Sequence, residues 1–577
     1  MNISEKEQKA IEIIEEQIGE SLSEVSHLER YSLGYYMQDQ HITGLSLYSC
    51  RLSNIPTEIK VLSSLKHIYL RGNNLINISD ELTSLSSLEV LDLSENELAS
   101  LPESISSLNQ LKELHLESNH LKQLPDSLGS LLLLEILDLS ENELETIPSS
   151  LGKMNKLQTL DLSRNNIKEL PDSIGELNSL EILYLGNNQL ELLPESIQNL
   201  SSLKRLNLRN NMIKGLPDTI GKLSFLTSLF LKGNEIERLP ESIGQLGNLI
   251  YLGLSSNNLK SLPESIGSLF SLDNLSLSSN RLKKLPESLG SLKSLLRLEL
   301  SNNLLTSLPL SIGNLSSLQI LRCDHNNLTD IPDTIGNLSN LEVLNLEINN
   351  IKELPESIGS LKSLKELNLY DNKLENIPDS IKGLSSLEIL DLSKNQIQKL
   401  PDSIGALNSL LELDLSTNQL TNIPESIGTL PLLKTFILGF NRLETIPSSI
   451  GFLTTLEIFD IGKNHLKKLP QSIGALTSLK HLYLYYNELN EIPDSIGSLH
   501  SLKYLYLGNN KLSMLPESVG YLKSLKYLFL RANFLSELPL SLESLPSLKY
   551  LNIEKNNLKG YLDFLHKLEV HGIKILK

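Results

Sequence analysis

Few residues in this chain are of types and spacings that could support chemistry, and one set of them is acidic. Its members recur at multiples of 23 residues or flank a residue that does. The set comprises Asp92, Glu113, His115, Glu117, Asp138 and Asp161. Carboxylates and an imidazole could hold a divalent cation, but oxygen-rich groups without fixed geometry are weak evidence for a metal. The sequence favours a solvated acidic column, and we predict no metal site and no cofactor.

Nothing in the sequence is typical of a catalytic centre. The chain has no GxxxxGK(S/T) phosphate-binding loop, no HExxH zinc motif and no paired CxxC motif. Its two cysteines, Cys50 and Cys323, stand where other copies of a repeat carry Asn and Leu. Thiols at such inward positions are poorly reactive because burial disfavours the thiolate. We therefore predict that the protein is not an enzyme.

The most informative set is aromatic and basic, and it lies near the C-terminus. Its aromatic and arginine members are His481, Tyr483, Tyr485, Tyr504, Tyr506, Tyr527, Phe529, Arg531 and Tyr550. Beside them stand Lys480, Lys503, Lys526 and Lys549. Eight of the 17 tyrosines of the chain fall between Tyr483 and Tyr550, and Tyr and Arg are common anchors of protein interfaces. This set is predicted to be the main partner-binding site, against the alternative that Tyr is simply a good strand former.

A second aromatic and basic set lies nearer the N-terminus. It comprises Tyr184, Arg205, Asn207, Arg209, Phe230, Lys232 and Tyr251. Its residue types match those of the C-terminal set, but it is smaller. We predict it as a secondary partner-binding site.

All of these residues are positioned by one repeated element. The stretch Leu157–Ser179 reads LQTLDLSRNNIKELPDSIGELNS, and it is 23 residues long. Steps of 23 residues from Asn73 to Asn556 land on Asn at all 22 positions, and one step earlier lands on Cys50. A fixed period of this length is typical of a solenoid, in which neighbouring units must stack to bury their apolar residues.

Each repeat is predicted to contain a strand, a turn and a short helical return. Leu160 and Leu162 alternate with polar residues, which is typical of a strand with one buried side. Pro171 lacks an N–H and cannot continue a ladder, and Ile174 and Leu177 then have the spacing of one helical or 3₁₀ turn. The repeated Asn is predicted to turn inward and bind backbone groups. The residues six, four and two places before it then lie on the open face of the sheet.

The repeat resembles the leucine-rich repeat family. The family pattern LxxLxLxxNxL is present as Leu157, Leu160, Leu162, Asn165 and Ile167. The tail LPxSIGxL resembles the intracellular subgroup of plant Ras-group-related and Ras-suppressor-like repeat proteins, and also the repeats of Roco-type GTPases. The resemblance implies an α/β solenoid shaped as a horseshoe, with a parallel sheet on the concave side and short helical or 3₁₀ turns on the convex side. It also implies a small GTPase or its regulatory complex as a partner.

Three regions follow from the extent of the repeat. Residues 42–558 are predicted to form a solenoid of about 23 units without an internal domain boundary. Residues 1–41 are predicted to be a helical N-terminal cap, with a capping box at Ser4 and Glu7 and a second helical piece in Val25–Met37. Residues 559–577 are predicted to cap the other end with a short helix and a last strand.

Charge and composition narrow the setting in which the protein works. The net charge is −18, but residues 463–577 hold 15 basic against 9 acidic residues. The polar N-terminus has no apolar signal segment, and no apolar run approaches the length of a membrane span. Two cysteines far apart in the repeat cannot pair, which is typical of the reducing cytoplasm. We predict a cytoplasmic protein that does not bind a membrane.

The sequence thus predicts a non-catalytic scaffold for protein–protein interaction that binds a partner on its concave face. Two alternatives stay open. The C-terminal units could bind a polyanion such as nucleic acid or a phosphate ligand, although the net charge argues against nucleic acid. The chain could also be an accessory subunit of a separately encoded enzyme.

Overall fold

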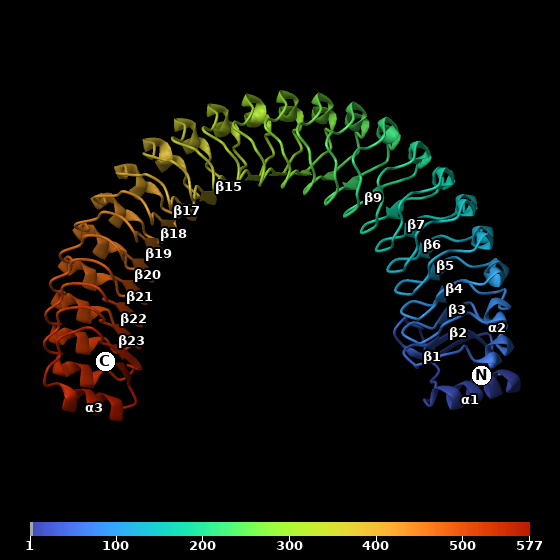
Figure 1. Ribbon diagram of the computed structural model, residues 1–577, viewed down its shortest axis with the longest axis horizontal. Coiled ribbons are helices and arrows are strands. Elements are labelled where there is room, and N and C mark those ends of the chain that lie inside the picture. The colour runs from blue at the N-terminus through green and yellow to red at the C-terminus, as the bar shows by residue number, and fades with distance from the viewer. Residues whose placement is uncertain (1–3) are drawn as a thin grey trace. The chain divides into compact units, whose positions relative to one another are not determined.

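The computed structural model describes residues 4–577, which form two compact units, residues 4–282 and 283–577. The 23-residue repeat runs through the junction without change, and the sequence had predicted no boundary there. Within each unit the strands lie along the inner side of the curved stack and the 3₁₀ helices along the outer side (Figure 1). The predicted solenoid with a parallel sheet and short 3₁₀ turns is thereby confirmed.

The first unit begins with helix α1, Glu5–Ile18, and also contains the short helix α2, Asp80–Thr83. Its strands are β1 Leu33–Gln38, β2 His41–Leu47, β3 His67–Tyr69, β4 Val90–Asp92, β5 Glu113–His115, β6 Ile136–Asp138, β7 Thr159–Asp161, β8 Ile182–Tyr184, β9 Arg205–Asn207, β10 Ser228–Phe230, β11 Tyr251–Gly253 and β12 Asn274–Ser276. Its 3₁₀ helices are η1 Thr57–Val61, η2 Glu103–Ser107, η3 Asp126–Ser130, η4 Ser149–Lys153, η5 Asp172–Glu176, η6 Glu195–Asn199, η7 Asp218–Lys222, η8 Glu241–Gln245 and η9 Glu264–Ser268.

The second unit repeats the same strand and 3₁₀ helix and ends in helix α3, Leu562–Val570. Its strands are β13 Arg297–Glu299, β14 Ile320–Arg322, β15 Val343–Asn345, β16 Glu366–Asn368, β17 Ile389–Asp391, β18 Glu412–Asp414, β19 Thr435–Ile437, β20 Ile458–Asp460, β21 His481–Tyr483, β22 Tyr504–Tyr506, β23 Tyr527–Phe529, β24 Tyr550–Asn552 and β25 Lys574–Leu576. Its 3₁₀ helices are η10 Glu287–Ser291, η11 Leu310–Asn314, η12 Asp333–Asn337, η13 Glu356–Ser360, η14 Asp379–Gly383, η15 Asp402–Ala406, η16 Glu425–Thr429, η17 Ser448–Phe452, η18 Gln471–Ala475, η19 Asp494–Ser498, η20 Glu517–Tyr521 and η21 Leu540–Ser544.

The core of each unit is a continuous stack of aliphatic side chains. In the repeat Leu157–Ser179, the side chains of Leu157, Leu160, Leu162 and Leu177 are fully buried. Equivalent leucines of the next repeats pack directly above them, because neighbouring strands pair in parallel with the same register, Leu160 beside Leu183. No repeat has a core of its own, so each depends on its neighbours for burial.

The repeated Asn ties each repeat to the one before it. Nδ2 of Asn165 donates to the carbonyl of Leu139 at 2.9 Å and to the carbonyl of Leu162 at 3.1 Å. Its Oδ1 accepts the backbone N–H of Leu144 at 2.9 Å. Leu139 and Leu144 belong to the preceding repeat, so one carboxamide satisfies backbone groups of two turns that water does not reach.

The residue before each Asn turns the chain sharply. From Gly72 to Lys555 this residue has a positive φ in every repeat, whether or not it is glycine. Ile348 is the bulkiest β-branched example, with φ 50°. A β-branched residue is strained in this left-handed conformation, whereas Asn tolerates it and stands there naturally at Asn302.

The N-terminal cap is only partly helical. Helix α1 begins as predicted at the N-cap Ser4, whose Oγ accepts the N–H of Glu7 at 3.2 Å. The predicted second helical piece, Val25–Met37, is wrong, because Leu33–Gln38 forms β1 and pairs antiparallel with β2. The hairpin turns at Asp39 and Gln40, both with positive φ. Neither residue is the glycine that usually marks such a turn, which hid the hairpin from the sequence.

At the other end, the predicted capping helix and last strand both form. Helix α3 buries Phe564, Leu565 and Leu568, and β25 adds to the sheet beside β24 in parallel. No helix among residues 4–577 combines the length and the apolar character that crossing a bilayer requires.

Replacing Asn165 with Ala is expected to lower the free energy of unfolding by about 1–3 kcal/mol, because the buried backbone groups of Leu139 and Leu144 lose their partner. Urea unfolding followed by circular dichroism measures the change. An unchanged unfolding midpoint would show that the carboxamide is not what holds adjacent repeats together.

Replacing Ile348 with Asn is expected to raise the free energy of unfolding by about 1 kcal/mol, since Asn relieves the strain of the left-handed conformation. The reverse change, Asn302→Ile, is the matched control and should be destabilising by a similar amount. If both substitutions shift the thermal midpoint in the same direction, backbone strain is not the cause.

Candidate functional site

The C-terminal aromatic and arginine residues lie together on the open side of the sheet. Strands β21, β22, β23 and β24 pair in register, so that His481, Tyr504, Tyr527 and Tyr550 form one row across them. The residue that follows each of these in the chain is a fully buried leucine, as at Leu505. Because strand side chains alternate, the rings must point away from the core. We call the nine residues predicted here, from His481 to Tyr550, the aromatic face.

The rings of the first row stack on one another. The centroids of His481 and Tyr504 are 4.5 Å apart with an interplanar angle of 8°. Those of Tyr504 and Tyr527 are 4.7 Å apart with an angle of 1°. Both spacings are close to the distance between parallel strands, so the sheet itself sets the stacking.

A second row of rings runs beside the first. Tyr483 stacks on Tyr506 at 4.6 Å, and Tyr506 stacks on Phe529 at 4.4 Å. Tyr550 closes both rows, with its ring tilted 46° to Phe529 at 5.3 Å. Each ring is half-buried, so the two rows form a continuous aromatic surface.

Tyr485 and Arg531 flank these rows. The Tyr485 ring meets Tyr483 edge-on at 6.4 Å and lies directly over Gly462. A Cβ at Gly462 would come within 2.6 Å of that ring, so the glycine makes room for it. The Arg531 side chain is exposed at the equivalent place two strands further along.

A column of lysines borders the aromatic face. Lys480, Lys503, Lys526 and Lys549 follow one another through backbone bonds, such as Lys503 N–H to the carbonyl of Lys480 at 2.9 Å. In several earlier repeats the same column places Lys beside Glu in ion pairs, as in Lys112 with Glu89 and Lys365 with Glu342, both at 2.7 Å. Here only Lys480 has a partner, Glu457. Within residues 4–577, no carboxylate reaches ion-pairing distance of the other three lysines.

Burial favours the uncharged form of four ionisable side chains of the aromatic face. Burial raises the pKa of Tyr483, Tyr485 and Tyr506 above the usual value of 10.0. Burial, followed by the charges of Lys503 and Lys480, lowers the pKa of His481 below its usual value of 6.5. The face therefore offers a neutral aromatic surface beside a positively charged border.

Four residues of the second predicted set lie in contact with one another. The ring of Phe230 on β10 contacts the ring of Tyr251 on β11, with centroids 4.7 Å apart. The guanidinium groups of Arg205, on β9, and Arg209, two residues after β9, lie 5.9 Å and 4.5 Å from the Phe230 ring centroid. We call Arg205, Arg209, Phe230, Lys232 and Tyr251 the arginine cluster. Tyr184 lies on β8, opposite Asn207 of β9.

The acidic set does not assemble around a common point. Asp92 accepts a hydrogen bond from Nε of Arg30 at 2.8 Å, and Arg71 bonds Glu95 and Glu117. Asp138 and Asp161 accept hydrogen bonds from the serines two residues after them. In the described part of the chain, no group of three His, Cys, Asp or Glu side chains is placed to hold a metal ion.

Sequence reasoning missed two features near these sites. Lys463 lies between two rings, 4.1 Å from the centroid of Phe440 and 5.4 Å from that of Tyr486. All three stand immediately before the repeated Asn, a position that the alternation of strand residues does not cover.

The segment before β1 also folds over the open side of the sheet. There the Tyr31 ring lies 5.2 Å from the guanidinium of Arg71, a contact for which the sequence holds no local signal.

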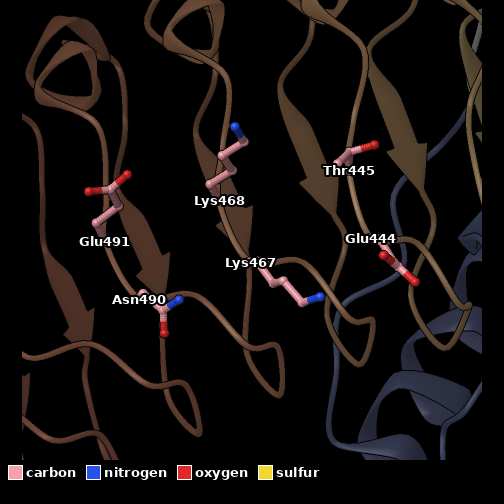
Figure 2. A pocket seen from close by; sticks show the side chains of 6 residues that line it. All are labelled: Glu444, Thr445, Lys467, Lys468, Asn490 and Glu491. Atoms are coloured by element: carbon pink, nitrogen blue, oxygen red, sulfur yellow. The ribbon is translucent and has the colours of Figure 1, made fainter.

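A shallow hollow lies in the loops that lead from the strands to the 3₁₀ helices. Figure 2 shows its lining residues, Glu444, Thr445, Lys467, Lys468, Asn490 and Glu491, which come from three successive repeats. The lining is polar and contains no aromatic ring, and it does not include the aromatic face. We therefore do not assign it a role in binding.

Models of the leucine-rich repeat match most of the chain. The model described as a leucine-rich repeat region matches residues 122–210, 195–252 and 248–326. The model described as a leucine rich repeat matches residues 63–121, 316–374, 339–397, 371–420, 385–443, 454–512 and 505–558. The chain belongs to the leucine-rich repeat family. No curated protein sequence matches it.

Solved leucine-rich repeat structures resemble this one along most of their length. The plant peptide hormone receptor RGFR1 in complex with RGF2 is 31% identical, with a TM-score of 0.68, and the match covers 93% of this chain and 92% of the receptor chain. The Arabidopsis receptor kinase HAESA in complex with the peptide hormone IDA and the co-receptor SERK1 is 31% identical, with a TM-score of 0.64, covering 92% and 93%. A leucine-rich repeat protein of Leptospira interrogans is 32% identical, with a TM-score of 0.53, covering 76% and 95%.

We expect the stability of the wild type to fall as the pH drops below about 6.5, the usual pKa of His. The lowered pKa of His481 in the fold favours its neutral form, so the unfolded chain binds the proton more readily. His481→Phe keeps a ring in the stack and should reduce this loss. Urea midpoints of both proteins at about pH 7.5 and about pH 5.5 measure it. Equal losses would mean that His481 is not held neutral.

Proposed function

We propose that this leucine-rich repeat protein is a non-catalytic scaffold that binds a protein partner through the aromatic face on β21–β24. The observation that carries the proposal is the pair of stacked ring rows on the open side of the sheet, bordered by unpaired lysines. Clustered Tyr and Arg side chains are typical energetic centres of interfaces. The stacked rings lose little side-chain entropy on binding because the sheet already holds them.

The lysine column gives the partner a charge preference. Lys503, Lys526 and Lys549 immediately precede the adjacent strands β22, β23 and β24, and like charges side by side are unfavourable. A partner surface rich in Asp and Glu would relieve that repulsion and would be attracted over distance, which raises the association rate. The similar receptor structures are complexes with peptide ligands in two named cases, which supports a polypeptide as the ligand.

The tail of the repeat suggests what kind of protein the partner is. LPxSIGxL resembles the intracellular Ras-group-related and Ras-suppressor-like proteins, and we infer a small GTPase or its regulatory complex as the partner in signalling. A cytoplasmic location fits the two thiols, which lie many repeats apart in the sequence. Burial raises the pKa of Cys50 to about 11 and that of Cys323 further. The plant receptors named above share this fold but argue against a cytoplasmic location and a small GTPase partner.

The double variant Tyr506→Ala/Tyr527→Ala should lose about 2 kcal/mol or more of affinity for the partner, because it breaks both ring rows. Affinity purification with wild type as bait, followed by mass spectrometry, identifies the partner, and a binding titration with each purified variant measures the loss. Tyr521→Ala is the matched control. It removes an exposed tyrosine of the same repeat from η20, on the opposite side of the solenoid.

Salt dependence distinguishes a protein partner from a polyanion. A phosphate polymer held by the lysine column would lose affinity steeply and linearly in log–log form as salt rises, because counterions are released. The proposal predicts a shallow slope, since the stacked rings supply most of the affinity. A steep slope, or full affinity of the double variant while it remains folded, would contradict the aromatic face as the protein-binding site.

A further inference from the structure

The open side of the sheet in the first unit is divided by charge. On β4 to β7, the outward positions of the strands and of the turn after each strand carry Asp92, Glu113, Glu117, Asp138 and Asp161. The same positions on β8 to β12 carry no Asp or Glu at all, but hold Arg205, Arg209 and Lys232. A carboxylate-free band with three cations is exceptional in a chain whose net charge is −18.

The two arginines are held in place from below. The ring of Phe230 has Tyr251 on the side of β11 and the guanidinium groups of Arg209 and Arg205 on the side of β9. The backbone N–H of Arg209 donates to Oδ1 of Asn207 at 3.1 Å. A guanidinium over a ring keeps its N–H groups in its own plane, free to bind a ligand at its edge.

Arg205, Arg209 and Lys232 have no ion pair in the part of the chain that the structure describes. No carboxylate within residues 4–577 lies at ion-pairing distance of Arg205, Arg209 or Lys232. Arginine and lysine elsewhere in this unit do find partners, as Lys204 does with Glu181 at 2.7 Å and Arg71 with Glu95 at 2.7 Å. Arg209 and Lys232 stand at the same position of adjacent repeats. The backbone N–H of Asn210, the residue after Arg209, donates to the Lys232 carbonyl, so the two cationic residues are held side by side. Like charges in such neighbouring positions repel each other.

We propose that the arginine cluster binds a phosphate monoester carried on a side chain of a polypeptide. Two guanidinium groups and an ammonium group supply three positive charges, which suits the charge of about −1.5 to −2 on such a group better than a single carboxylate. Guanidinium groups also match phosphate oxygens in paired hydrogen bonds. The site lies in the first unit, on strands other than those of the aromatic face, and it does not depend on the function proposed for β21–β24.

Fluorescence anisotropy with the full chain tests this site. The probe is a labelled, Gly/Ser-rich peptide with one phosphoserine, and its twins carry Ser or Glu at that place. The phosphopeptide is expected to bind saturably and at least about tenfold more tightly than either twin. Arg205→Gln/Arg209→Gln should weaken it at least about tenfold, whereas Arg238→Gln, which removes a charge from a loop of the next repeat, should change it little.

Other outcomes decide against the proposal. Equal affinity for the Glu twin would mean that the cluster attracts negative charge without recognising phosphate. An equal loss in Arg238→Gln would mean that only the overall charge matters. Inorganic phosphate that competes as strongly as the phosphopeptide would overturn the polypeptide carrier. If the double variant does not fold, Phe230→Leu provides the test, because it keeps all three charges and removes the ring under the guanidinium groups. Unchanged phosphopeptide affinity in folded Phe230→Leu would overturn the cluster.

Discussion

The structure depends above all on the carboxamide of the repeated Asn. Asn165 shows the pattern that recurs within each unit: its side chain donates to a carbonyl of its own repeat and to one of the preceding repeat, and accepts an N–H from the preceding repeat. Within a unit, these bonds fix the separation and the register of successive strands. The residue before the repeated Asn has a left-handed conformation, which is strained where that residue is neither Gly nor Asn, as at Ile348. Leucine burial supplies most of the stability, but the Asn bonds decide how one repeat sits on the next.

A fixed register turns a repeated position in the sequence into a straight row on the surface. On β21 to β24, Tyr at two outward positions becomes two rows of stacked rings, because the strand spacing is close to that of stacked aromatic rings. On β9 and β10, cations at two positions become a cluster around one ring. The same scaffold therefore presents chemically different surfaces at different places along its length, and these surfaces are set by only a few outward residues per repeat.

Much of this could be predicted from the sequence, and the failures have specific causes. The period and the alternation of Leu160 and Leu162 predicted the strands, the 3₁₀ returns and the outward direction of Tyr506 and Tyr527. The hairpin of β1 and β2 was not predicted, because its turn at Asp39 and Gln40 lacks Gly and Asn. The pairing of Arg30 with Asp92 joins residues 62 apart and depends on how the cap folds back. Some lysines of the column beside the strands have an acidic partner, as Lys112 does, and others do not, as at Lys526. The difference depends on the residue at the same position of the neighbouring repeat, which a single repeat does not show.

The most direct test of the aromatic face is hydroxyl-radical footprinting of the complex with its purified partner, read by mass spectrometry. Tyrosine rings react readily when exposed, and the face contains half-buried Tyr483, Tyr506 and Tyr527, while Tyr521 is exposed on η20. Binding through the aromatic face predicts that oxidation of the first three tyrosines falls in the complex and that oxidation of Tyr521 is unchanged. Protection of Tyr521, with unchanged oxidation of Tyr506 and Tyr527, would place the partner on the opposite side of the solenoid and contradict the proposed site.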